Sequence, residues 1–246
     1  MSGHSKWSQI KRKKGLKDQE KGRIFSKLAR AITIAVLEGG GATDPEHNLK
    51  LRMAIDKAKH DNMPKENIQR AIEKGIGPDK ESLHEIVYEG FGSKGVVFLI
   101  QATTDNSNRT HSEIKNVLER HHGKIGAQGS VMYLFQKCGM ISFDKTGNRE
   151  EDVFNFADKI HALDIDDDGS MFTVYFPFEN LGRVRDFLGE LKPTPAELDY
   201  RPTSSVKITD QGSAKSILSL VESLESLDDV HKVFSNFDIP EEYLEL

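Results

Sequence analysis

Apolar residues recur every three or four positions in three stretches near the amino terminus. The first stretch starts at Gly22 and ends before "GGG" at 39–41, the second covers 46–61, and the third lies in "NMPKENIQRAIEKG". This spacing predicts three amphipathic helices, the third with Pro64 near its first turn and Gly75 as its C-cap. We therefore expect a helical domain over 21–76, with these cations on its outer faces: Lys50, Arg52, Lys57, Lys59, Lys65, Arg70 and Lys74.

The segment "GIGPDKES" at 75–82 is typical of a linker, and domain motion about it is an open alternative. After this segment the hydrophobic period changes from 3.6 to 2. "HEIVYEGFG" and "GVVFLIQATT" predict two strands joined by a turn at "SKG". A helix in "SNRTHSEIKNVLERHHG" and a strand at "SVMYLF" follow. The tail predicts a strand at "SVKITD", a helix over 213–226 and a strand at "DVHKVFSNF". We expect 84–135 and 204–246 to form one α+β domain.

Residues 139–201 have a rhythm of their own, with four strands and two helices in the order βαββαβ. The strands are "GMISFD", a short one near "ALDID", "MFTVYFP" and an extended piece at "AELDYRP"; the helices are 149–162 and 178–191. This order is the ferredoxin-like pattern. The predicted fold class is therefore α+β multidomain: an N-terminal three-helix domain, then an α+β domain that carries an inserted ferredoxin-like domain.

Charge is unevenly distributed along the chain. Residues 1–80 contain 18 Lys/Arg and 10 Asp/Glu, whereas residues 81–246 contain 16 and 29. Such asymmetry indicates a polyanionic partner for the basic end, while the acidic remainder resists indiscriminate binding to nucleic acid.

A basic arm over 1–20 holds too few apolar residues for a core of its own, so we expect it to be extended or ordered only by docking. Its cations are expected to contact phosphates, and Trp7 either stacks on a base or anchors the arm to the helical domain. The alternative is a solvated tail. The candidate nucleic-acid-binding residues of the arm and of the start of the helical domain are Lys6, Trp7, Lys11, Arg12, Lys13, Lys14, Lys17 and Arg23.

The polar loop "TDNSNRT" at 104–110 joins a predicted strand to a predicted helix and leaves two interpretations open. Its Asn or Ser side chains are good helix caps. Alternatively, it is an exposed recognition loop in which Arg109 contacts a phosphate or a base. Arg109 therefore completes the set of candidate binding residues.

Other candidate chemistry is weak. No P-loop, G-x-G-x-x-G, G-x-S-x-G or H-E-x-x-H motif is present. "DIDDDG" is read as a hairpin turn rather than a calcium loop, so a hydrolase or metal enzyme built on Asp164, Asp166, Asp167 and His161 is a minor alternative. We expect no catalytic residues, metal, cofactor or small-molecule substrate.

Cys138, the one cysteine, is expected to be a buried hydrophobe, which fits a reducing cytosol. No stretch is long and apolar enough to span a membrane.

Several motifs together resemble the YebC family, whose mitochondrial relatives are translational activators of cytochrome c oxidase. They are "GHSKW", "KGRIFSKL", "GGG", "LRMAIDKAKHDNMPKENIQRAIEKG", "TDNSNRT", "GSVMYLF" and "DDVHKVFSN". The resemblance implies a helical domain followed by two α+β domains, the third ferredoxin-like and inserted in the second. It brings no enzymatic activity. Because the similarity starts at Met1, we expect no targeting extension and a cytoplasmic protein of bacterial type.

The resemblance implies two functions. Family members are described as probable transcriptional regulators that bind DNA, and also as ribosome-associated factors that relieve stalling at proline-rich sequences. We expect a nucleic-acid-binding regulator of gene expression, primarily a transcriptional regulator. The alternative is a translation factor that binds ribosomal or transfer RNA, with the ribosome as its partner.

Overall fold

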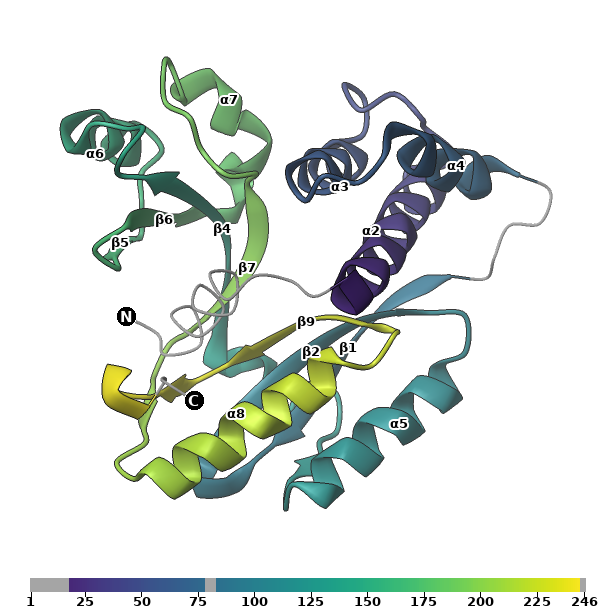
Figure 1. Ribbon diagram of the computed structural model, residues 1–246, viewed down its shortest axis with the longest axis vertical. Helices are drawn as coiled ribbons and strands as arrows, with labels where there is room; N and C mark the ends of the chain where they lie inside the picture. The colour runs from purple at the N-terminus through teal and green to yellow at the C-terminus, as the bar shows by residue number, and fades with distance from the viewer. Residues whose placement is uncertain (1–17, 78–82, 244–246) are drawn as a thin grey trace.

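The computed structural model describes residues 18–77 and 83–243 of the chain, and Figure 1 shows three groups of elements. We call them the helical domain, the second domain and the ferredoxin-like domain. The fold class predicted from the sequence is confirmed. Over the described residues, no helix has the length and apolar character to cross a membrane.

The helical domain consists of α2 (Asp18–Glu38), α3 (Leu49–His60) and α4 (Lys65–Ile76). Its core is formed by residues of these helices and the turn before α4, among them Ile32, Val36 and Leu51, which are fully buried. The hydroxyl of Thr33 donates to the carbonyl of Ala71 at 2.9 Å and so ties α2 to α4. Asn48 caps α3, because its side chain accepts from the backbone N–H of Leu51 at 3.0 Å.

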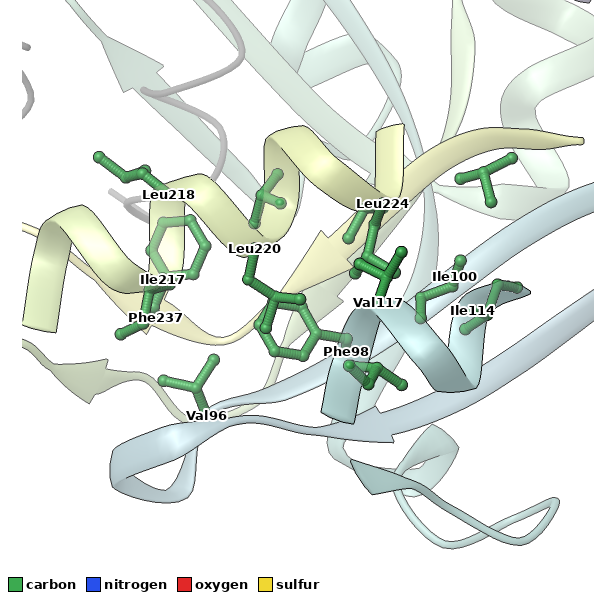
Figure 2. Close-up of a cluster of buried hydrophobic side chains, with 14 of the residues drawn as sticks. Val96, Phe98, Ile100, Ile114, Val117, Ile217, Leu218, Leu220, Leu224 and Phe237 are labelled. Carbon is green, nitrogen blue, oxygen red and sulfur yellow. The ribbon is translucent and has the colours of Figure 1, made fainter. Parts of the chain in front are cut away.

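The second domain is a four-stranded antiparallel sheet with strand order β3-β1-β2-β9. Helices α5 and α8 lie along one face, as Figure 1 shows. Phe98 and Ile100 of β2 are buried there against Leu220 and Leu224 of α8, together with Val117 of α5 (Figure 2). The bounds are β1 (His84–Phe91), β2 (Val97–Thr104), α5 (Ser107–Arg120), β3 (Lys124–Ile125), β8 (Val206–Lys207), α8 (Gln211–Glu225), β9 (Val230–Ser235) and β10 (Phe237–Asp238).

The ferredoxin-like domain has strand order β5-β6-β4-β7, all antiparallel, so the first and third strands of the unit are central. Its buried apolar cluster joins the sheet to α6 and to the segment around α7. The bounds are β4 (Phe135–Asp144), α6 (Glu150–Lys159), β5 (Asp164–Asp167), β6 (Met171–Pro177), the 3₁₀ helix η3 (Phe178–Arg183), α7 (Val184–Phe187) and β7 (Glu197–Pro202).

Three local predictions were wrong. "SVMYLF" is not a strand: η2 (Met132–Leu134) is a 3₁₀ turn, and β4 then runs unbroken from Phe135, across the gap between the predicted domains. The carboxylate of Glu89 imposes this turn, since it accepts from the backbone N–H of Val131 at 2.5 Å and of Met132 at 2.9 Å. The predicted helix over 178–191 is instead the 3₁₀ helix η3 followed by the single α-helical turn α7, and residues 188–191 are not helical.

Gly75 is the third. It lies inside α4, and Gly77 is the C-cap. A Cβ at Gly75 would lie 2.6 Å from the Cβ of Val36, so the glycine is required by the close approach of α4 to α2.

We expect Gly75→Ala to lower the free energy of unfolding by about 1–3 kcal/mol, because the methyl group forces two packed helices apart. Urea denaturation measures the change. Gly22→Ala is the control: Gly22 is in α2 with nothing within 4 Å of its Cβ position, so the variant should gain about 0.5–1 kcal/mol from helix propensity. Equal stability of the two variants would contradict the close-packing explanation.

Candidate nucleic-acid interface

Most of the predicted binding residues belong to the basic arm. Seven of them lie outside the described residues: Lys6, Trp7, Lys11, Arg12, Lys13, Lys14 and Lys17. Arg23 and Arg109 are described, and both are exposed. The interface is therefore built from the cations of the helical domain and from the loop that carries Arg109.

Two cations of α2 face the second domain. Lys27 donates to the carbonyl of Glu225 at 2.5 Å, and Arg30 forms an ion pair with Asp229. These partners lie at the end of α8 and in the loop before β9, and Figure 1 shows that loop beneath α2. The i, i+3 spacing of the two cations places both on one helix face.

Three cations of α3 face the other domains, and for these the predicted outer placement was wrong. Lys50 pairs with Glu85 of β1 at 2.7 Å, and Lys57 pairs with Glu197 of β7 at 2.5 Å. Arg52 donates to the carbonyl of Gly182 at 3.3 Å. Helical periodicity identifies a polar face but not what lies opposite it. We call the five residues that contact other domains the inward cations: Lys27, Arg30, Lys50, Arg52 and Lys57.

Four other cations of the helical domain are exposed, and within the described part of the chain they form no ion pair. They belong to α2, to the last turn of α3 and to α4. We call them the outward cations: Arg23, Lys59, Lys65 and Arg70. An exposed cation with no carboxylate beside it keeps its field available to an external phosphate.

The "TDNSNRT" loop is a helix cap in the structure. The side chain of Asn106 accepts from the backbone N–H of Arg109 at 3.1 Å, which satisfies a free donor at the start of α5. The Arg109 guanidinium binds Asp105 and Asp229, both at 2.8 Å, and these carboxylates raise its pKa. Arg109 remains half-exposed, so its role in binding nucleic acid stays a prediction.

Asp229 is a central residue of this region that no sequence pattern singled out. Only 3 % of it is exposed, and its carboxylate accepts from Arg109, from Arg30 of the helical domain and from the hydroxyl of Thr110 at 2.6 Å. Burial alone would raise the pKa of Asp229, but these hydrogen bonds lower it to about 2. A separation of 120 residues from Arg109 hides the pair from local sequence patterns.

His231 lies two residues further along the chain, in β9. Its Nε2 atom is buried and accepts no hydrogen bond from the described residues. Desolvation, then repulsion from Lys27, Arg30 and Lys50, lowers the pKa of His231 to about 4, although Asp229 acts in the opposite direction. The imidazole is therefore neutral at pH 7 and adds no charge to the inward cations.

The "DIDDDG" segment is a turn braced by cations. Asp168 accepts from the backbone N–H of Ser170 at 2.8 Å and closes the β5–β6 hairpin. Asp164 pairs with Arg201 at 2.6 Å, and Asp167 pairs with Lys145. Among the described residues no group of three acidic, histidine or cysteine side chains is arranged to hold a metal ion.

Models of two family domains match the chain. The "TACO1/YebC protein N-terminal domain" matches residues 5–78, and the "TACO1/YebC second and third domain" matches residues 83–237. The chain belongs to the TACO1/YebC family.

Similar proteins extend over the whole chain. A "Probable transcriptional regulatory protein" of Syntrophus aciditrophicus is 43% identical, over 100% of this chain and 98% of its own length. A protein of Aquifex aeolicus with the same description is 42% identical, over 100% and 99%. The crystal structure of a conserved hypothetical protein, Aq1575 from Aquifex aeolicus, matches with a TM-score of 0.84 and 39% identity, over 91% of this chain and 93% of that one. The three-part architecture is therefore that of the TACO1/YebC family.

We expect Arg109→Gln to lower the free energy of unfolding by roughly 1–3 kcal/mol, because the buried Asp229 loses a charged partner. Urea denaturation measures the effect. Arg120→Gln in the same helix is the control; its guanidinium donates to the carbonyl of Asn116 within the helix, so the change should stay within about 0.5 kcal/mol. An Arg109 variant of unchanged stability that binds nucleic acid more weakly would instead favour the recognition role.

We expect stability to fall as the pH drops from about 6.5 towards 4, because the unfolded chain protonates His231 before the folded protein does. The loss from this residue by pH 4 is on the order of 3 kcal/mol. His231→Gln should flatten this part of the pH profile in thermal or urea unfolding. The control, His60→Gln at an exposed histidine, should keep the wild-type profile. If His231→Gln also keeps the wild-type profile, the pH dependence of stability arises from another titratable group.

Proposed function

We propose that this protein is a non-enzymatic, nucleic-acid-binding regulator of gene expression that acts as a transcriptional regulator on DNA. The observation that carries the proposal is the set of outward cations, which are exposed and free of ion pairs within the described part of the chain. The descriptions of the relatives as probable transcriptional regulatory proteins support the same function.

Phosphate contacts by the helical domain and the basic arm would supply most of the affinity. Residues 1–17, which lie outside the described residues, contain six Lys/Arg and no Asp/Glu. Each phosphate that a Lys or Arg neutralises releases roughly 0.7–0.9 of a counterion, so binding weakens steeply as salt rises. Contacts of this kind position a protein on the polymer but do not read its sequence.

The acidic part of the chain is suited to face away from the bound nucleic acid. Residues 81–246 contain 29 Asp/Glu against 16 Lys/Arg. This excess repels phosphates and directs the helical domain towards them. The proposal includes the cytoplasm as the site of action and assigns no catalytic residue; Arg109 remains a candidate contact at the edge of the second domain.

We expect reversal of the outward cations in Lys59→Glu, Lys65→Glu and Arg70→Glu to weaken binding to duplex DNA at least tenfold at low salt. The plot of log affinity against log salt should become shallower by about 0.7–0.9 for each phosphate that the variant no longer neutralises. Fluorescence anisotropy across a salt series measures both. Reversal of Lys11, Arg12, Lys13 and Lys14 tests the arm in the same way.

A control variant carries three reversals in the acidic part of the chain: Lys115→Glu, Lys207→Glu and Lys215→Glu. This control changes the net charge by the same amount as the reversal of Lys59, Lys65 and Arg70. If the helical domain forms the interface, the control should lose much less affinity for DNA than that variant. Wild-type protein with a flat salt dependence would overturn the proposal. Weak duplex binding, with co-sedimentation with ribosomes that the arm reversal abolishes, would replace the DNA target with ribosomal RNA.

A further inference from the structure

The contacts between the helical domain and its neighbours are strongly charged. The inward cations bind oxygens of the other two domains, and Arg185 of the ferredoxin-like domain reaches back to Asp56 of α3 at 2.9 Å. Lys57 and Glu197 meet where the three domains come together, since Glu197 also pairs with Lys232 of β9 at 3.4 Å. Apart from Asp229, which is buried, these ionic groups keep part of their surface in water, so salt and external ions compete with them.

Most buried apolar side chains of the helical domain lie in its own core, whereas Ile34, on the same face of α2 as Lys27 and Arg30, is buried outside that core. That core is made only of the domain's own residues. Met53 of α3, which is partly buried, packs against the core of the ferredoxin-like domain. A domain with a closed core of its own and a polar interface is free to separate without exposing much apolar surface.

We propose that the inward cations are a second polyanion-binding surface, which the carboxylates of the other domains occupy while the helical domain is docked. The proposal rests on the proposed function and adds its regulation. In the docked arrangement, Glu85, Glu197 and Asp229 occupy the positions beside these cations that the phosphates of a nucleic acid would take. Separation of the helical domain uncovers the inward cations, and a polyanion that binds them holds the protein open.

The geometry around Lys50 provides a matched pair of variants. Its ammonium group lies 2.6 Å from Glu38, which is in the helical domain itself, and 2.7 Å from Glu85, which is in the second domain. Both carboxylates are partly exposed. Glu38→Gln and Glu85→Gln therefore remove the same charge from the same lysine, but only the second removes a contact between domains.

We expect Glu85→Gln to bind duplex DNA roughly 3- to 10-fold more tightly than wild type at low salt, and Glu85→Gln combined with Glu197→Gln to bind more tightly still. Its salt dependence should steepen by about 0.7–0.9 for each additional phosphate that the protein neutralises. Glu38→Gln raises the charge near Lys50 without opening the interface, so it should stay within about twofold of wild type. Circular dichroism and urea unfolding confirm that each variant is folded.

Distance measurements test the opening directly. Cysteines that replace Gln69 in α4 and Asn116 in α5, both exposed, carry a donor and an acceptor dye. Cys138 does not interfere, because it is buried and burial raises the pKa of its thiol to about 12. Addition of duplex DNA should lower the transfer efficiency in wild type, and the Glu85 and Glu197 variant should already be partly open without DNA.

The outcomes separate this inference from the proposed function. If wild type binds DNA through the outward cations while the Glu85 and Glu197 variant behaves as Glu38→Gln does, in affinity and in distance, the second surface is overturned and the function stands. If wild type binds weakly and the Glu85 and Glu197 variant binds tightly and opens, the inference is supported. If none of these proteins binds DNA or RNA at low salt, both are overturned.

Discussion

A buried carboxylate shared by two guanidinium groups is the interaction on which the arrangement of the molecule depends. Asp229 precedes β9 and accepts from Arg109 of its own domain and from Arg30 of the helical domain. Burying a carboxylate is costly unless charged donors surround it. Asp229 therefore needs both arginines, and through Arg30 it fixes where α2 lies on the second domain.

The same principle extends along the whole interface of the helical domain. Lys50 and Lys57 meet Glu85 and Glu197, so the basic part of the chain is held to the acidic part by its own charges. This divides the cations by function. Those that face inward maintain the docked arrangement, and those that face outward remain available to a polyanion. A protein whose docking and binding use one kind of interaction can couple the two, because each phosphate bound competes with a carboxylate.

Much of the architecture was predictable from periodicity. Helical spacing identified α2 to α4, alternation identified the hairpin of β1 and β2, and the βαββαβ order identified the ferredoxin-like domain. Local chemistry also sufficed for Asn106, whose side chain caps α5. The errors arose where a distant group decides the local conformation. Glu89 holds the turn before β4, and Val36 forces a glycine at position 75.

The order of the elements, the basic character of the amino-terminal part and the family all followed from the amino-acid sequence. They depend on side-chain period and charge, which are local properties of the chain. Which cations are available to a partner depends instead on how the domains pack. Lys57 and Lys59 are two residues apart, yet one pairs with Glu197 and the other is exposed. The reason is that a helix turns by about 100° per residue, so the neighbouring domain covers one of them and leaves the other in water.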